Sequence, residues 1–215
     1  MVSDNTDASI RPDIVEAAAE VFGAHGYERA TLDEIAALVG MQKGSLYYHI
    51  ESKEQLLMAI HTKLFHILSL RMTEAIKSAE SDPLAEITQL IRAIVDVIST
   101  NRVAVRVVLR DRGSLTERNS RRIEGNRAAV LKMLENVVRR LCRESGTTNI
   151  GSALTIAYGV MGMTYFVSEW FNPSQHDADT IADIFLKMLL DGLMQPTSGR
   201  SSRAGLKKRG RHLAV

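Results

Sequence analysis

The sequence predicts an all-α protein. Apolar residues recur at helical spacing along most of the chain, and no run alternates apolar and polar residues for long enough to form a half-buried strand. The 4 prolines, Pro12, Pro83, Pro173 and Pro196, each fall where a helix would begin or end. A chain of 215 residues with 45% hydrophobic and 24% charged residues can bury a substantial core in one or two domains.

The first helix begins at Pro12 and ends at Gly23 and Gly26, because glycine readily adopts the left-handed conformation that ends a helix. One side of it is apolar, through Ile14, Ala18, Val21 and Phe22.

The second helix begins at Thr31, which forms a capping box with Glu34, and it ends at Gly40. We expect its buried face to consist of Leu32, Ile35, Ala36 and Val39.

The third helix is short, from about Gln42 to His49, and only Leu46 and Ile50 are expected to face inwards. A helix of this length has little stability of its own, so the neighbouring helices must hold it. The fourth is long: Ser52 is its N-cap, and it runs from Lys53 to Ser78. Five more helices are predicted, at 82–100, 103–110, 116–145, 149–172 and 177–194.

Composition excludes several classes of protein. The single cysteine, Cys142, allows no intrachain disulfide and is typical of a reducing compartment, and we interpret it as a packed side chain rather than a nucleophile. Residues 1–10 are polar and acidic, unlike a signal peptide. The segment 150–168 is uncharged and long enough to span a membrane, but its glycines and hydroxyl groups favour a buried helix, so we expect no membrane and a cytoplasmic protein.

Charge is distributed unevenly along the chain, although the net charge is only +2. Residues 197–215 contain six cations and no acid, whereas residues 1–50 contain three cations and eight acids. Any claim of nucleic-acid binding must therefore depend on local features rather than on total charge. The basic tail either adds nonspecific affinity for DNA or is a solvated extension.

Two short helices joined by a turn that contains glycine, at 31–49, form a helix-turn-helix pattern. The polar side chains of the second helix suit a major groove: lysine reaches phosphate or guanine, glutamine pairs with adenine, and hydroxyl groups bond phosphates. Tyrosines on such a helix are also common as packing residues. The predicted DNA contacts are Thr31, Gln42, Lys43, Gly44, Ser45, Tyr47, Tyr48, His49 and Lys53.

The run TLDEIAALVGMQKGSLYYHIESKEQLL resembles the DNA-binding region of the TetR family, the tetracycline-repressor-like bacterial regulators. Its motif residues here are Leu46, Tyr47, Tyr48, His49, Ile50, Ser52, Lys53, Glu54 and Leu56, with isoleucine in place of the usual phenylalanine at 50. The resemblance covers about residues 12–60. It implies nine helices, of which the first three bind DNA and the last two pair subunits, and a homodimeric repressor that a small-molecule effector releases from a palindromic operator.

We therefore expect a helix-turn-helix domain at 10–52, a domain for effector binding and dimerisation at 53–196, and a tail at 197–215. Small residues at helical spacing in 149–172 would allow close approach of a partner helix, as in a dimeric four-helix bundle. The residues expected at the dimer interface are Gly151, Thr155, Gly159, Gly162, Ile184, Phe185, Met188 and Leu189.

The middle of the chain is expected to contain an apolar effector pocket with a few polar groups. The candidates, each of which could equally be plain core, are Phe65, Leu68, Met72, Val105, Arg106, Leu109, Arg110, Met133, Val137, Met161, Tyr165 and Trp170. Arg102, Arg106 and Arg110 share one helical face, which is either solvated or a site for an anionic ligand. The runs LRDRGSLTERNSRRI and MGMTYFVSEWFNP also resemble the part of the family that senses acyl-CoA thioesters, with Trp170, Phe171 and Pro173 as its motif.

Two other functions compete with a repressor. The sequence has no paired catalytic acids, no glycine-rich phosphate loop and no metal-ligand set, since His61 and His66 are five residues apart; we therefore expect no enzyme, cofactor or metal. A DNA-binding activator would have the same motifs as a repressor and stays open.

Overall fold

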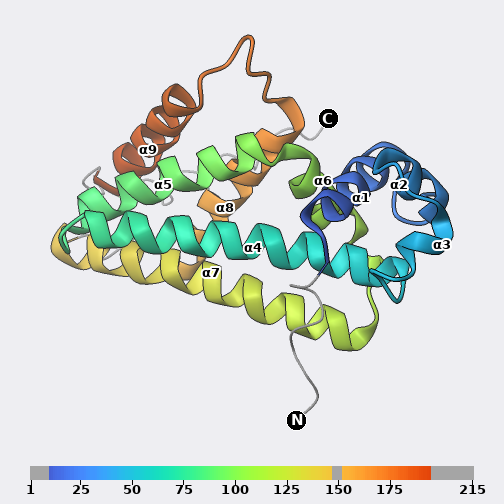
Figure 1. The fold of residues 1–215 in the computed structure, drawn as a ribbon. Helices are drawn as coiled ribbons and strands as arrows, with labels where there is room; N and C mark the ends of the chain where they lie inside the picture. Colours follow the sequence, from blue (N-terminus) through green and yellow to red (C-terminus); the bar gives the residue numbers. More distant parts are fainter. Residues whose placement is uncertain (1–9, 147–151, 195–215) are drawn as a thin grey trace, which may run out of the picture.

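A computed structural model describes residues 10–146 and 152–194. In these two stretches the chain forms α-helices and one short 3-10 helix, with no strand, so the all-α prediction is confirmed (Figure 1). The elements are α1 (Pro12–His25), α2 (Leu32–Leu38), α3 (Lys43–Leu46), α4 (Lys53–Ser78), α5 (Pro83–Thr100), α6 (Arg102–Arg110), η2 (Asp111–Ser114), α7 (Glu117–Glu144), α8 (Ala153–Trp170) and α9 (Ala178–Met194).

Side chains at the helix starts explain most of these boundaries. At α2, the Thr31 hydroxyl accepts a hydrogen bond from the Glu34 amide at 3.3 Å, while the Glu34 carboxylate accepts one from the Thr31 amide at 2.8 Å. Ser52 caps α4 in a similar way. Each cap satisfies backbone N–H groups that a helix start leaves without partners, so the polar residues before α2 and α4 fix where these helices begin.

Helix α3 is shorter than the sequence predicted. It covers Lys43–Leu46, and residues 47–49 form a turn in place of further helix. The amides of Tyr48 and His49 donate to carbonyls only three residues back, at 3.2 and 2.9 Å, which is the tighter 3-10 pattern common at helix ends. The predicted start of α8, at 149, was early by four residues and that of α9, at 177, by one; residues 147–151 lie outside the described part of the chain.

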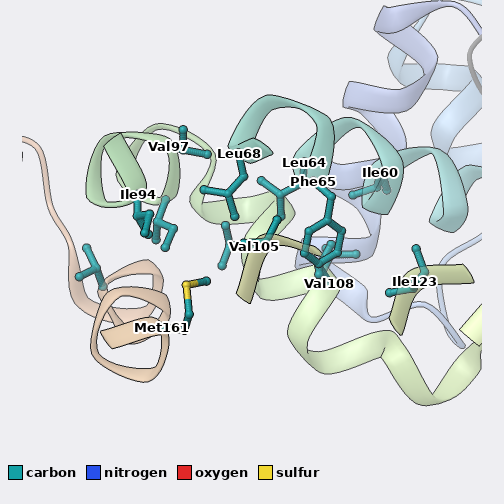
Figure 2. Packing of buried hydrophobic residues seen from close by; sticks show 14 of the residues in the cluster. Ile60, Leu64, Phe65, Leu68, Ile94, Val97, Val105, Val108, Ile123 and Met161 are labelled. Carbon is teal, nitrogen blue, oxygen red and sulfur yellow. The ribbon is translucent and has the colours of Figure 1, made fainter. Parts of the chain in front are cut away.

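The helices form an elongated body in which α1, α2 and α3 lie together at one end, whereas α9 lies at the other (Figure 1). The long helix α4 runs from the first group along the body and packs against α5 and α7. Helix α6 packs against α1 as well as against α4 and α8, so it connects the first group of helices with the rest of the body. Figure 2 shows Leu64, Phe65 and Leu68 of α4 pointing towards Val105 and Val108 of α6 in the apolar interior.

Helices α1 and α6 approach each other closely at Gly23. A Cβ atom placed on Gly23 would lie 2.7 Å from a methyl carbon of Val103, closer than real Cβ atoms come. A larger residue at this position would have to displace the Val103 side chain, so glycine lets α1 and α6 pack this closely.

A membrane-spanning helix is not found in 10–146 or 152–194, since no helix there is both long and apolar enough to cross a bilayer. The uncharged segment that raised the question forms α8, whose buried side chains pack against α5, α6 and α7.

Candidate DNA-binding surface and effector cavity

The recognition segment, residues 42–49, is held by two apolar anchors and is otherwise open to solvent. Leu46 and Ile50 are 0% and 3% exposed, as predicted. Tyr47 and Tyr48 are 52% and 90% exposed, so they are not packing residues of the core. The other exposed side chains of the segment are Gln42, Lys43, Ser45 and His49, with Gly44 between them. The chain thus presents hydrogen-bonding groups here that it does not itself bury.

The lysine of this segment forms an ion pair with an acid of α2. The Lys43 ammonium lies 2.7 Å from the Asp33 carboxylate of α2. The hydrogen bond from Lys43 to Asp33 raises the pKa of the lysine, which therefore stays charged. Because both groups are exposed, the pair is weak enough for a phosphate to replace the aspartate.

Two further predicted DNA contacts, Thr31 and Lys53, also have hydrogen-bond partners inside the chain. The Thr31 hydroxyl donates to the Glu34 carboxylate at 2.8 Å, yet the residue is exposed. Lys53 is different, because its ammonium donates to the carbonyls of Tyr27, Glu28 and Ala30 at 2.8, 3.2 and 3.1 Å. These three bonds use all three N–H donors of the ammonium group. Lys53 therefore stabilises the loop after α1 and has no donor left for a phosphate.

A narrow apolar cavity lies between the helices that follow the first three. Its walls come from α4, α5, α6, η2, α7 and α8, and its lining residues are His61, Leu64, Phe65, Leu68, Val97, Ile98, Val105, Val108, Leu109, Arg112, Arg127 and Tyr165. Its free volume of about 20 Å³ has room for one water molecule. Five of the predicted effector candidates line it: Phe65, Leu68, Val105, Leu109 and Tyr165.

Three polar lining residues were not among the predicted contacts: His61, Arg112 and Arg127. A signal for His61 was present in the sequence, because it precedes Leu64, Phe65 and Leu68 at the spacing of one helical face. Arg112 and Arg127 had no such signal, since only the fold brings η2 and α7 to the same cavity.

The remaining apolar candidates lie elsewhere. Met72 is fully buried and Val137 is 2% exposed, both as core residues. Met133 packs against the core from its edge. Met161 lines a second hollow, of about 290 Å³, between α7 and α8. The Trp170 ring meets the His176 ring edge-on, with 5.1 Å between the centroids.

The three arginines of α6 each donate to backbone carbonyls, although Arg110 is also exposed to solvent. Arg102 and Arg106 donate to the carbonyls of Phe171 and Ser168 at the end of α8. Arg110 donates to the carbonyls of Phe22 and Gly23 near the end of α1, and it also pairs with Asp111 at 3.0 Å. Cations suit the carbonyl-rich ends of helices, so α6 is fixed to α1 at one end and to α8 along the rest.

Part of the predicted dimer surface is exposed in the single chain. Thr155, Gly159 and Gly162 of α8 are exposed, as are Ile184 and Met188 of α9 at 52% and 58%. Phe185 and Leu189 are partly buried against the core, and Gly151 lies outside the described residues. Further large apolar side chains on α8 are exposed: Leu154, Tyr158, Phe166 and Trp170.

Groups of His, Cys, Asp and Glu that could hold a metal are absent from the described stretches 10–146 and 152–194. Burial raises the pKa of the Cys142 thiol, which disfavours the reactive thiolate and agrees with a packed role.

Two family models match this chain, one over its first helices and one over the rest. Residues 14–60 match the model of the tetR family of bacterial regulatory proteins, and residues 80–193 match that of a tetracyclin repressor-like C-terminal domain. The chain is 25% identical over 195 residues to the HTH-type transcriptional repressor KstR2 of Rhodococcus jostii, covering 86% of this chain and 92% of that protein.

Two further relatives match over a shorter part of the chain. The HTH-type transcriptional regulator SrpR of Pseudomonas putida is 41% identical over 63 residues, which cover 29% of this chain and 30% of SrpR. The A-factor receptor protein of Streptomyces griseus is 51% identical over 47 residues, which cover 22% of this chain and 17% of the receptor. The chain thus spans under a third of the length of these two relatives.

Solved structures share the whole fold. A tetR-family regulatory protein from Rhodococcus RHA1 superposes with a TM-score of 0.77 at 26% identity, covering 89% of this chain and 98% of that one. AibR, solved in complex with isovaleryl coenzyme A and operator DNA, superposes with a TM-score of 0.70 at 25% identity, covering 81% and 95%. With a family model on each half and the fold shared along its length, the chain belongs to the tetR family of bacterial regulatory proteins.

Proposed function

We propose that this protein is a homodimeric transcriptional repressor that binds a palindromic operator and is released by a small-molecule effector. The observation that carries the proposal is the recognition segment: seven of the eight positions 42–49, all except the anchor Leu46, are exposed, and six of these seven have polar side chains or rings. We infer that residues 10–52 form the DNA-binding domain and residues 53–196 the effector and dimer domain.

Enzymatic activity is not part of this function, because the family to which the chain belongs consists of regulatory proteins that bind DNA. A regulator that reads operator DNA acts in the bacterial cytoplasm, which is where we place this protein.

The proposed DNA contacts are Thr31 and the exposed residues of the recognition segment, without Lys53. Base edges would be read by Gln42, Lys43 and Ser45, and the hydroxyl groups of Tyr47 and Tyr48 would bond phosphates. Since the first fifty residues carry more acids than cations, affinity must come from these few contacts and not from a broad basic surface.

A matched pair of lysine substitutions tests the DNA contact. Lys43→Ala should weaken operator binding about tenfold, the loss of a contact worth ~1–3 kcal/mol, with an unchanged melting temperature. Lys77→Ala removes an exposed lysine at the far end of α4 and should leave operator affinity unchanged. Footprinting should show a protected inverted repeat next to the gene, and the absence of any protected repeat would rule the proposal out.

The exposed apolar surface of α8 and α9 supports a homodimer. Helices α8 and α9 touch each other little within the chain, and each presents large apolar side chains to solvent. Two copies that pair these helices about a twofold axis would form a four-helix bundle. Such symmetry would set the two recognition segments about 34–36 Å apart, one turn of DNA.

Sedimentation tests the dimer. Ile184→Glu places a charge on the proposed interface and should convert the protein to monomers that no longer protect a full operator. Leu70→Glu is the control, because Leu70 of α4 is exposed to nearly the same extent, 50% against 52%. Dissociation by Leu70→Glu and not by Ile184→Glu would refute this interface.

The cavity between α4 and α8 supports a small-molecule effector, and the structure of AibR with isovaleryl coenzyme A favours an acyl-CoA or another apolar or anionic compound. Release requires that the effector bind one conformation more tightly than the other. Helix α6 offers the connection, because Leu109 lines the cavity while the neighbouring Arg110 holds the end of α1. Ligand entry that moved α6 would move the DNA-binding domain with it.

Arg110→Met tests this connection. The variant should bind operator and effector, but the effector should release DNA at least fivefold less effectively, since coupling between sites is worth ~1–3 kcal/mol. Arg71→Met removes an exposed arginine of α4 that pairs only with acids and should respond like the wild type. A normal response of Arg110→Met would exclude α6 as the route.

Repression and activation are separated by a reporter assay in a strain that lacks the gene. We expect expression from the neighbouring promoter to rise, and a fall would identify an activator.

A further inference from the structure

His61 of α4 is a buried polar side chain without a partner. Its exposure is 0%, and neither ring nitrogen has a hydrogen-bond partner among the described residues. Buried polar groups almost always have partners, because an unsatisfied one costs about 1–3 kcal/mol. The ring lies beside Phe65 and forms part of the cavity wall. The missing partner can therefore come only from a molecule that enters the cavity, a water or a ligand.

The electrostatic surroundings of His61 are positive. Burial, together with the charges of Arg127 and Arg112, lowers the pKa of His61 to about 4, and Asp111 opposes this effect only in part. The ring is therefore neutral at physiological pH and offers one N–H donor and one acceptor. Since positive charge surrounds it, a ligand group placed here gains from being negative.

The two arginines in the cavity wall share one acid. The Glu124 carboxylate lies 3.1 Å from Arg127 and 3.6 Å from Arg112, and no other acid contacts them in the described ion pairs. Two cations with one carboxylate leave room for a second anion. The rest of the wall is apolar except for Tyr165, so the site has one positive end and one long apolar side.

Arg127 and Tyr165 also line the second hollow, between α7 and α8. They therefore form a partition between the narrow cavity and a wider groove of about 290 Å³. A ligand whose apolar part occupied the cavity would carry its polar end at this partition.

We propose that the effector is an acyl compound, whose apolar chain lies along Leu64, Phe65 and Leu68, whose carbonyl oxygen accepts a hydrogen bond from His61, and whose negative charge pairs with Arg127 and Arg112. This inference rests on the proposed function, in which the cavity is the effector site. A free carboxylate would bring its oxygen to His61 and its charge to the arginines together. In a coenzyme A thioester the uncharged carbonyl would bond His61, and the phosphates, separated from it by the pantetheine arm, would extend into the groove beyond Arg127.

Binding must widen the cavity, because about 20 Å³ cannot hold an acyl chain. The walls that would part are α4 and α6, and both are attached to the DNA-binding domain, through Lys53 and Arg110. An effector that fits only the widened cavity would bind the widened conformation more tightly than the closed one, and it would thereby shift the protein towards the widened conformation.

Titration calorimetry on the full-length protein tests the proposal without DNA. Octanoate, octanoyl-CoA and octanol have the same chain, and only octanol lacks both the carbonyl and the charge. We expect octanoate or octanoyl-CoA to bind at least tenfold more tightly than octanol. Preference for octanoate would identify a free acid, and preference for octanoyl-CoA a thioester. Equal affinity for octanol, or no binding of either acyl probe, would overturn the proposal.

Variants locate the contacts. Arg127→Met and His61→Leu should each reduce acyl affinity about tenfold and leave octanol affinity unchanged, while Arg127→Lys, which keeps the charge, should retain most of the preference. Arg121→Met, an exposed arginine of the same helix, is the control. Wild-type acyl affinity in both Arg127→Met and His61→Leu would refute these contacts. Operator binding is measured in a separate experiment. Failure of the acyl probes to bind would therefore contradict the effector proposal without contradicting the repressor proposal.

Discussion

The recognition segment and the effector cavity both contain polar groups that the chain leaves without partners, but in opposite environments. Tyr48 is 90% exposed and can bond water until DNA arrives. His61 is fully buried and has no hydrogen-bond partner among the described residues. An exposed unpaired group costs the fold almost nothing, whereas a buried one lowers stability, so the cavity indicates a ligand more strongly than the surface does.

The two regions also differ in what holds them. The recognition segment depends on Leu46 and Ile50, while the cavity is enclosed by five α-helices and η2. We therefore expect different effects from substitutions of a buried anchor, of the buried His61 and of the exposed side chains around the recognition segment.

The largest effect is expected from the anchor. Leu46→Ala removes a fully buried side chain and should lower the free energy of unfolding by about 2–5 kcal/mol. Chemical denaturation measures this, and operator binding should fall with the folded population. Leu38→Ala truncates a leucine of α2 that is 56% exposed, and it should change stability by less than about 0.5 kcal/mol. Similar losses in both variants would show that burial does not separate anchors from tips.

A smaller effect is expected from pH. The pKa of His61 is lowered from 6.5 to about 4 in the folded protein, so the unfolded chain binds the proton first as the pH falls. Stability from this group is therefore complete above the unfolded pKa and is lost as the pH falls below it. Between about pH 7 and pH 5 the loss amounts to ~2 kcal/mol.

His61→Leu should remove that part of the pH dependence, measured as the difference in unfolding free energy from the wild type at each pH. His66→Leu is the matched control, because His66 lies on the exposed side of the same helix. If both variants keep the wild-type slope, His61 does not titrate abnormally.

A third effect concerns one hydroxyl group. Tyr48→Phe should weaken operator binding about fivefold, the worth of a single hydrogen bond of ~1 kcal/mol, and should leave the melting temperature unchanged. A loss on the operator and on unrelated DNA alike would identify a phosphate contact, and a loss on the operator alone a base contact. Unchanged affinity for both would remove Tyr48 from the interface.

The smallest effect is expected at the exposed ion pair. Asp33→Asn removes the acid 2.7 Å from Lys43 and should strengthen operator binding less than about fivefold, since exposed pairs are worth under ~1 kcal/mol. The gain should shrink as salt is added. Asp96→Asn, which removes an exposed partner of Arg71, should not change binding. Weaker binding by Asp33→Asn would mean that the pair positions Lys43 for DNA.

Local sequence signals predicted most of the helices. The caps at Thr31, Ser52 and Asp82 are short-range features, and α4 spans Lys53–Ser78 as expected. The end of α3 was missed because tertiary contacts, rather than propensity, decide where such a short helix stops.

The cavity was harder to predict than the recognition segment. The proposed DNA contacts other than Thr31 lie within residues 42–49, so one short motif contains them. The cavity combines six elements, and the positions of Arg112 and Arg127 depend on how those elements pack. The partners of the α6 arginines could not be predicted for the same reason, since they are carbonyls at the ends of α1 and α8.

Lys53 and Arg110 join the DNA-binding domain to the rest of the chain, and both do so through backbone carbonyls. A carbonyl is present whatever side chain a residue carries. Side chains of the DNA-binding domain can therefore change without breaking these two attachments, provided that Gly23 keeps its close approach to Val103. We therefore expect a graft of residues 10–52 from a relative to keep these two attachments where its backbone follows the same course.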